Sequence, residues 1–425
     1  MAVTATPVSL VDRVCPFCPL HCDDLEVSAE GSILSGGCPI ADQGSKASVS
    51  LAPSIAGKPV SHDAALAEAV KILGASKSPM VSGLAADVEG LRGAIEVADK
   101  LSAVFDHGAS DGFFNNLHVL QRRGALYTTP AEVRNRADVL VLLGTEVWKR
   151  LPRFFNRYIP AGPQLFNANP KNRKVYILGG PQNPGPIDGA DVTVIEAQLD
   201  HAAELAFTLG ALIAGRKPQA KSAAGVSIDK LAEIAEAMSK ATYAVLAWEP
   251  PNLGPQGDLA VEAFYDLILG LNKTGRAAGL PLPAGGHLTG AYQVSLWQAG
   301  TTMRTSFASG KPVYDPRVNS FARLTKDHRY DALLWVTSLP GPQVVQQKGL
   351  PLVVVSSQAL PDGVVPDVFI PVAMPSRDHG GTFFRGEGVV SIHAAPWRSS
   401  STLPSAADTL TALARLLPER EVPQC

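Results

Sequence analysis

From about residue 60 onward, short and uninterrupted apolar segments alternate with amphipathic ones. The apolar segments are rich in Val, Ile and Leu on both faces, which is typical of parallel strands buried between two layers of helices. The amphipathic segments have helical spacing, and residues 61–76 open with Ser61 as an expected N-cap. This alternation predicts an α/β fold with mostly parallel sheets. The expected strands lie within residues 79–85, 103–108, 130–146, 174–180, 191–197, 242–249, 330–338, 351–358 and 367–375.

The chain has 425 residues, which is too long for one ordinary hydrophobic core. We predict a small N-terminal module around the cysteines, followed by two or more Rossmann-like α/β units. Within the module, residues 25–36 have the alternation and the central turn of a hairpin. The predicted division is residues 1–55 for the cysteine-cluster module, 56–200 for the first α/β unit, 201–375 for the second, and 376–425 for a closing segment and helix.

The overall charge and hydropathy exclude several classes of partner. The formal net charge is −2 and no long basic run is present, so non-specific binding to nucleic acid has little electrostatic support. The first residues lack the basic start and the long apolar run of a signal peptide. No stretch approaches the roughly 18 uninterrupted apolar residues that a membrane helix needs. We therefore expect a cytoplasmic protein that binds neither nucleic acid nor membrane.

Four of the five cysteines fall within one short N-terminal segment with gaps of two, three and fifteen residues. These cysteines are Cys15, Cys18, Cys22 and Cys38. Four thiolates at this spacing suit a [4Fe–4S] cluster, or a structural Zn²⁺ held by four cysteines. The alternative is four reduced thiols without a metal. His21 lies among these cysteines as an expected neighbour rather than a ligand, and Cys425 is an expected bystander.

Three segments resemble the B subunits of formylmethanofuran dehydrogenases, a family within the molybdopterin oxidoreductase superfamily. Residues 15–27, CPFCPLHCDDLEV, resemble the opening of that subunit, and residues 106–147 resemble its metal-pterin loop and the helix and strand that follow. Residues 380–391, GGTFFRGEGVVS, resemble a closing motif that is shared by the wider superfamily. The resemblance covers nearly the whole chain in the family's order, and it implies an iron–sulfur module followed by Rossmann-like units.

One position departs from the family pattern. In redox-active members a cysteine precedes the His-Gly pair and binds tungsten or molybdenum, whereas here Asp106 precedes His107. A carboxylate is a harder ligand than a thiolate and donates less charge to a high-valent metal. The sequence also has no strong G-x-G-x-x-G motif for the phosphates of a pterin dinucleotide. We therefore expect the Mo/W-pterin to be absent. The alternative is a catalytic Mo/W-pterin formylmethanofuran dehydrogenase subunit with Asp106 as the metal ligand.

The resemblance is strongest to the B subunit of the bacterial formyltransferase/hydrolase complex, which is built from homologues of the dehydrogenase subunits. It implies a non-redox B subunit in tetrahydromethanopterin-linked one-carbon oxidation to formate, as in methylotrophy. The implied partners are homologues of the dehydrogenase A, C and D subunits, and the implied shared cofactor is a methanofuran-like formyl carrier. A third hypothesis is an electron-transfer or zinc-stabilised structural module that has no role in handling the carrier.

Asp106 and His107 are the candidate catalytic pair, as a residual or vestigial site. A carboxylate can orient an imidazole for proton transfer. The alternative is an inherited loop histidine that makes only structural hydrogen bonds. The sequence contains no G-x-S-x-G, H-E-x-x-H or P-loop motif, so a stand-alone hydrolase or ATPase has no motif support.

Six further residues are candidates for binding a cofactor or carrier. The candidates are Glu146, Lys149, Arg304, Arg317, Gly381 and Thr382. Glu146 follows an apolar strand and could bind a sugar, and Lys149 begins a basic cluster that could receive an anionic tail. Arg304 and Arg317 could bind carboxylates of a glutamyl-bearing carrier, and Gly381-Thr382 could bring backbone amides to a ligand. The alternatives are solvated helix or loop charges.

Overall fold

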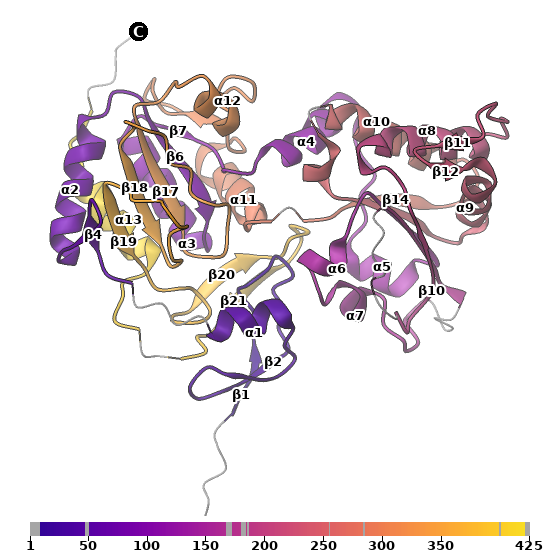
Figure 1. Cartoon of the computed structure of the whole chain (residues 1–425), viewed down its shortest axis with the longest axis horizontal. Helices are drawn as coiled ribbons and strands as arrows, with labels where there is room; N and C mark the ends of the chain where they lie inside the picture. Colours follow the sequence, from indigo (N-terminus) through magenta and orange to yellow (C-terminus); the bar gives the residue numbers. More distant parts are fainter. Residues whose placement is uncertain are drawn as a thin grey trace, which may run out of the picture. The chain divides into compact units, whose positions relative to one another are not determined.

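The computed structural model describes residues 9–420 apart from 47–50, 167–171, 180–183, 185–186, 255, 284 and 399–400. Cys425 lies outside the described residues. The chain divides into two compact units, and each is described by itself. The first unit combines residues 1–110 with 285–425, and the second unit is the insertion 111–284 (Figure 1).

A nine-stranded sheet forms the centre of the first unit, in the order β16-β15-β7-β6-β17-β18-β19-β4-β5. The five central strands are parallel to one another. At each edge, two outer strands pair antiparallel with each other, and the inner one of them pairs antiparallel with the neighbouring central strand. The central strands are β7 (Val104–Phe105), β6 (Pro79–Ala85), β17 (Ala332–Thr337), β18 (Leu352–Ser356) and β19 (Val368–Pro371). The edge strands are β16 (Val313–Tyr314), β15 (Thr305–Ser306), β4 (Ser54–Ile55) and β5 (Lys58–Pro59).

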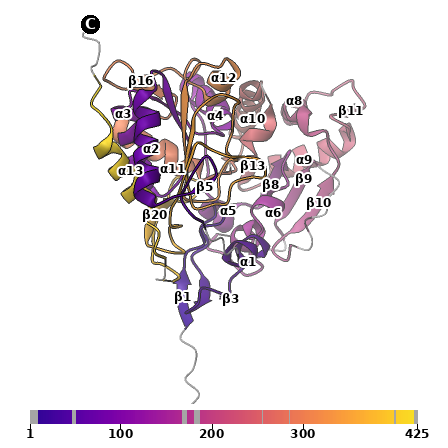
Figure 2. The same cartoon turned by 60° about the vertical axis from the view of Figure 1, so that its left-hand side comes forward.

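Helices cover this sheet, which explains why every residue of β6, β17 and β18 is buried. The helices of the unit are α2 (His62–Ala75), α3 (Val88–Lys100), α11 (Leu288–Ala299), α12 (Phe321–Lys326) and α13 (Ala406–Leu416). Helix α13 packs against α3 and α2 (Figure 2). Ser61 caps α2 by accepting a hydrogen bond from the backbone of Ala64, as the sequence predicts.

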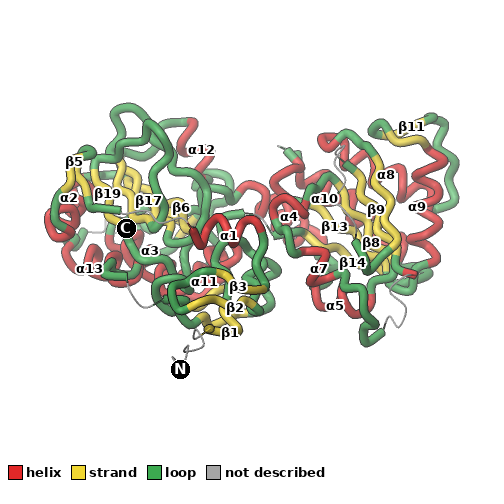
Figure 3. The backbone as a smooth tube through the Cα atoms, turned by 60° about the horizontal axis from the view of Figure 1, so that its bottom comes forward, coloured by secondary structure: helices red, strands yellow, loops and turns green. Residues whose placement is uncertain are grey.

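A separate three-stranded antiparallel sheet carries the cysteine segment of the first unit. Its strands are β1 (Ser9–Arg13), β2 (Leu25–Ser28) and β3 (Ile33–Ser35), and α1 (Pro39–Lys46) lies beside β3 (Figure 3). Strands β2 and β3 form the expected hairpin. A second hairpin, β20 (Gly381–Phe384) and β21 (Ser391–Ala394), contains the closing motif.

The second unit is built on a five-stranded, fully parallel sheet in the order β10-β9-β8-β13-β14. Its strands are β8 (Val139–Leu143), β9 (Lys174–Leu178), β10 (Asp191–Ile195), β13 (Ala244–Trp248) and β14 (Ala277–Pro281). Strand β8, the first in chain order, lies in the middle of this sheet. The direction in which successive strands are added therefore reverses between β8 and β13, and open α/β sheets bind ligands at such a reversal.

Helices and short elements surround this second sheet. The helices are α4 (Asp111–Arg123), α5 (Pro130–Arg136), α6 (Val147–Arg150), α7 (Phe154–Tyr158), α8 (Ala202–Ile213), α9 (Ile228–Lys240) and α10 (Gly257–Leu271). The 3₁₀ turns η2 (Leu199–His201) and η3 (Pro250–Leu253) and the hairpin β11 (Ser222–Ala223) and β12 (Val226–Ser227) complete it. One core cluster joins residues of α8, α9 and α10 to the strands.

The expectation of an α/β fold with parallel sheets is confirmed. The division of the chain differs from the predicted one. The predicted boundary at residue 200 lies inside the second unit, because β8–β10 before it and β13–β14 after it share one sheet. Strand β6 likewise pairs with β17, more than two hundred residues away. Among the described residues, no helix is long and apolar enough to cross a bilayer.

Candidate functional site

The cysteine loop between β1 and β2 folds back on itself. The backbone N–H of Cys15 donates to the carbonyl of Cys22 over 2.7 Å, and that of His21 donates to the carbonyl of Cys18 over 3.1 Å. Cys15, Cys18 and Cys22 are buried, and Cys38 is partly exposed. Burial, and then the charges of the other three cysteines, raises the pKa of the Cys15 thiol well above its usual value. The structure therefore brings Cys18, Cys22 and Cys38 within electrostatic reach of Cys15.

The cysteine loop meets one requirement of a metal site and does not meet another. Three buried cysteine sulfurs and a partly exposed fourth are the kind of soft donor set that an iron–sulfur cluster or Zn²⁺ takes. However, in the part of the chain that the structure describes, no three His, Cys, Asp or Glu side chains converge closely enough to hold a metal ion. The donor types suit a metal, but the side chains do not converge on one point. The [4Fe–4S] or zinc site therefore stays a prediction.

Three buried histidines form a chain of neighbours that begins in the cysteine loop: His21 lies in the loop, His287 contacts His21, and His107 interacts electrostatically with His287. His21 Nδ1 is 3.1 Å from the carbonyl oxygen of Cys15, and His21 Nε2 is 3.0 Å from His287 Nδ1. Burial lowers the pKa of His21 and of His107 to about 4. Burial, and then the charges of those two histidines, lowers the pKa of His287 well below its usual value. All three imidazoles are therefore neutral at physiological pH.

His287 was missed by the sequence reasoning, and His21 was treated only as a neighbour of the cysteines. No local signal could have joined them, because 266 residues separate the two. Both have a positive φ, 40° for His21 and 53° for His287, which a non-glycine residue rarely adopts. Such strain is retained only where the surroundings hold it, and it is common at functional sites.

Asp106 and His107 are neighbours in sequence but have separate partners. Oδ2 of Asp106 accepts hydrogen bonds from Ser110 Oγ at 2.9 Å and from the backbone N–H of Phe321 at 2.7 Å. The imidazole of His107 lies 2.9 Å from the carbonyl of Gly286 through Nε2, and its Nδ1 accepts from the backbone of residue 109. None of these contacts joins the Asp106 carboxylate to the His107 imidazole. They are hydrogen bonds of the kind expected if His107 has only a structural role.

The two candidate arginines differ in position. Arg304 is buried and its Nε lies 3.7 Å from Oδ2 of Asp106. The guanidinium also donates to Ser110 Oγ and, through Nη1 at 2.8 Å, to the carbonyl of Pro316. Arg317 is exposed, and its backbone N–H donates to Asp315. The structure thus brings Arg304 to Asp106 and leaves Arg317 on the surface.

At the strand reversal of the second unit, the predicted pair Glu146 and Lys149 forms a surface ion pair at 2.8 Å. The buried carboxylate there is Glu249, directly after β13. It accepts a hydrogen bond from the hydroxyl of Thr145 and is ion-paired with Arg150 Nη2 at 3.2 Å. Sequence reasoning missed Glu249. The available signal was an acidic residue directly after an apolar strand.

In the closing motif, Gly381 begins β20 and is buried. A Cβ on it would lie 2.9 Å from Asp87 Oδ2, so glycine is needed for this close approach. Burial raises the pKa of Asp87, the N-cap of α3, to about 6, although His379 acts in the opposite direction. The hydroxyl of Thr382 lies 3.3 Å from Nδ1 of His393 on the adjacent strand.

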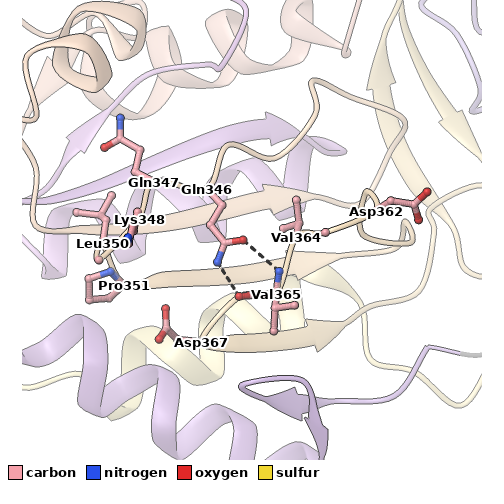
Figure 4. A pocket seen from close by; sticks show the side chains of 11 residues that line it. Gln346, Gln347, Lys348, Leu350, Pro351, Asp362, Val364, Val365 and Asp367 are labelled. Atoms are coloured by element: carbon pink, nitrogen blue, oxygen red, sulfur yellow. Dashed lines mark hydrogen bonds between the residues drawn. The ribbon is translucent and has the colours of Figure 1, made fainter.

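One hollow of the first unit, of about 730 Å³, lies at the amino ends of β18 and β19. In Figure 4, the side-chain amide of Gln346 bonds both the N–H and the carbonyl of Val365 across it. Two smaller hollows, about 270 and 320 Å³, share Pro340 and Gln358 at the carboxyl ends of β17–β19. Because α/β sheets bind ligands at carboxyl ends, the smaller pair is the better placed.

The chain is similar to known proteins over most of its length, although no family model matches it. It is 30% identical over 365 residues to the B subunit of the formyltransferase/hydrolase complex Fhc of Methylorubrum extorquens, covering 85% of this chain and 96% of the relative. It is 26% identical over 397 residues to the B subunit of a tungsten-containing formylmethanofuran dehydrogenase 2 of Methanocaldococcus jannaschii, covering 88% of this chain and 91% of the relative.

A solved structure agrees with these likenesses. The crystal structure of the formyltransferase/hydrolase complex (FhcABCD) from Methylorubrum extorquens with methylofuran contains a chain with a TM-score of 0.74 and 28% identity, covering 86% of this chain and 98% of that one. Fold, cysteine loop and relatives define an α/β protein of the same class as the B subunits of formylmethanofuran dehydrogenases. Within that class, the chain belongs to the family of formyltransferase/hydrolase complex B subunits.

Proposed function

We propose that this chain is the non-redox B subunit of a formyltransferase/hydrolase complex, which transfers and hydrolyses the formyl group in tetrahydromethanopterin-linked one-carbon oxidation to formate. In this role it supports a methanofuran-like formyl carrier, and its partners are homologues of the dehydrogenase A, C and D subunits. The observation that supports the proposal most is the likeness to a chain of the FhcABCD complex over 98% of that chain. A subunit matched over its full length can keep the same place in a complex.

The surroundings of Asp106 support the non-redox part of the proposal. In redox-active relatives the corresponding residue is a cysteine that binds tungsten or molybdenum. Here the carboxylate is fully buried and accepts hydrogen bonds from Ser110 and Phe321 next to Arg304. The Glu249–Arg150 ion pair lies at the strand reversal of the second unit, where a Rossmann-like unit would receive a dinucleotide. An ion pair of the chain itself at each of these two positions supports the absence of a metal-pterin.

The finer points of the proposal follow from the same likeness. The two parallel sheets are Rossmann-like units that form the scaffold, the cysteine loop holds a structural [4Fe–4S] cluster, and the complex works in the cytoplasm of a methylotroph. The cluster would be held by Cys15, Cys18, Cys22 and Cys38. In a non-redox subunit its task would be to fix the loop.

Two other functions make different predictions. A catalytic Mo/W-pterin dehydrogenase subunit with Asp106 as ligand would reduce a dye with formate and contain molybdenum or tungsten. A zinc-stabilised structural module would bind its partners and have no effect on the carrier. The family membership favours neither.

The test is reconstitution of the four-subunit complex with and without this chain. We expect formyl transfer and formate release to fall at least about tenfold without it, and no formate-linked dye reduction with it. Metal analysis of the same preparation for Fe, Zn, Mo and W separates the alternatives. Unchanged formate release without the chain would contradict the proposal.

A further inference from the structure

The side chain of Asp106 is enclosed by the chain itself. It has no exposed surface, and it lines none of the three hollows described above at the strand ends of the first unit. A catalytic metal needs room next to its protein ligand for its remaining ligands and for substrate. The residues present therefore do not fit the molybdenum or tungsten centre that the wider family implies.

The same carboxylate is surrounded by donors of this chain. Oδ2 accepts from Ser110 Oγ and from the backbone N–H of Phe321, and Arg304 Nε lies 3.7 Å away. The side chain of Arg304 is only 6% exposed, so the two charges are held out of water together. A buried carboxylate with an arginine and two hydrogen-bond donors has its charge balanced without a metal.

Asp106 and Arg304 also make hydrogen bonds that fix one segment of the chain, residues 301–321. Arg304 Nη1 donates to the carbonyl of Pro316, and Asn319 Nδ2 donates to the carbonyl of Arg304. Arg304 has a φ of 44° and the preceding Met303 a φ of 46°. Two successive strained residues persist only where the surroundings over-determine them. The contacts at Asp106 supply that constraint, because they fix both the start and the end of the segment.

We propose that Asp106 is a positioning residue: together with Arg304 it replaces the metal centre of the redox-active relatives by an internal ion pair that fixes residues 301–321. The inference rests on the non-redox part of the proposed function. The inference goes beyond the proposed function because it assigns a structural role to Asp106. The aspartate is then needed for its negative charge and not for metal binding.

The experiment is backbone hydrogen exchange of the full chain, as the wild type and as Asp106→Asn. Asparagine keeps an oxygen acceptor for Ser110 and Phe321 but removes the charge that faces Arg304. We expect the amides of residues 304–321 to exchange about tenfold faster or more, while those of β18 stay unchanged. The matched control is Asp327→Asn, because that carboxylate is 40% exposed and pairs with Arg323 on the nearby helix α12. The control should leave residues 304–321 unchanged.

A second pair of variants guards against loss of folding. Arg304→Lys keeps the charge and should recover most of the protection that Arg304→Met loses. Metal content is measured on the wild type and on Asp106→Cys, both produced in a host that makes Mo/W-pterin. We expect neither metal in either protein.

The outcomes separate the inference from the proposed function. Molybdenum or tungsten in the wild type would overturn both. Metal uptake only by Asp106→Cys would show that the space for a metal remains, and would overturn the inference alone. Unchanged exchange of residues 304–321 in both Asp106→Asn and Arg304→Met would also overturn the inference alone.

Discussion

Nδ1 of His287 lies 3.0 Å from Nε2 of His21, and this contact joins the start of α11 to the cysteine loop. Each ring nitrogen of the pair can be either donor or acceptor, so one imidazole must donate and the other must accept. If His21 Nδ1 donates to the carbonyl of Cys15, its Nε2 accepts from His287. The contact therefore needs one proton, and not two, on the two facing nitrogens.

The neutral histidines predict a loss of stability in mild acid. The pKa of His107 is about 4 and that of His287 is well below its usual value, whereas both titrate near 6.5 in the unfolded chain. Below pH 6.5 the unfolded state therefore binds more protons than the folded state, so stability falls as pH falls toward 4. Each such group steepens this slope by up to about 1.4 kcal/mol per pH unit.

Asp87 acts in the opposite direction. Its pKa is raised to about 6, so the folded state holds that proton and gains relative stability on acidification. One carboxyl does not offset two imidazoles. The measurement is urea unfolding at several pH values between 7.5 and 5, on the wild type and on His107→Asn. The variant should have a shallower slope, while His393→Asn, at an exposed position, should match the wild type. Equal slopes in all three proteins would contradict the assignment.

The cysteine loop predicts about four iron atoms per chain after anaerobic preparation, if the four thiolates hold a [4Fe–4S] cluster. Cys18→Ser removes one buried sulfur and should lower the iron content severalfold and weaken the visible absorption. Cys425→Ser is the matched control, because this cysteine is far from the cluster in sequence and should leave iron unchanged. About one zinc per chain would instead support the structural zinc alternative, and the absence of both metals would support reduced thiols.

Local patterns in the sequence predicted the elements of the fold well. Strand β6 spans Pro79–Ala85, the same residues as the predicted strand, because a short apolar run that is buried on both faces can be recognised without knowing its neighbours. The hairpin of β2 and β3 was recognised from its alternating pattern and central turn, which are also local features. The division into units was not predictable in this way. It depends on which strands pair, and β6 pairs with β17 across the whole inserted unit.

The candidate site shows the same limit. Of the partners of Asp106, Ser110 is close in sequence, but Arg304 and Phe321 come from one distant segment, residues 301–321. The family position predicts a metal ligand or a catalytic dyad, and the ion pair with Arg304 could not be inferred from it. His287 had no local signal, and Glu249 had only its place directly after an apolar strand. Their burial next to another titratable group is displayed only by the folded chain.

Replacing Arg150 by methionine should destabilise the second unit. The change removes the cation that pairs with Glu249 at 3.2 Å, and it leaves a buried carboxylate with only Thr145 and Asn252 as partners. Arg150 is 30% exposed, which weakens the pair, so we expect a loss of about 1–3 kcal/mol. Lys149→Met is the control, since its pair with Glu146 is at the surface, and it should cost less than about 1 kcal/mol. Hydrogen exchange of β8 and β13 in urea measures both.

Gly381→Ala should destabilise the first unit although both residues are small. A Cβ at this position would lie 2.9 Å from Oδ2 of Asp87 and 2.9 Å from Cβ of Pro375, and neither is the end of a long flexible side chain. Overpacking of this kind costs about 1–3 kcal/mol. In Gly74→Ala, on helix α2, the new Cβ meets Pro418 at an ordinary 3.4 Å, and the gain in helix propensity should stabilise by up to about 1 kcal/mol.

The same substitution, glycine to alanine, should therefore lower the stability of the first unit at Gly381 and raise it at Gly74. Thermal unfolding of the full chain measures both, with exchange of β20 and α3 amides to locate the effect. Asp87→Asn in the Gly381→Ala background tests the cause. The amide is no smaller than the carboxyl, so a steric conflict would persist in the double variant. Recovery of stability there would show that the charge of Asp87 is responsible, and would contradict the steric account.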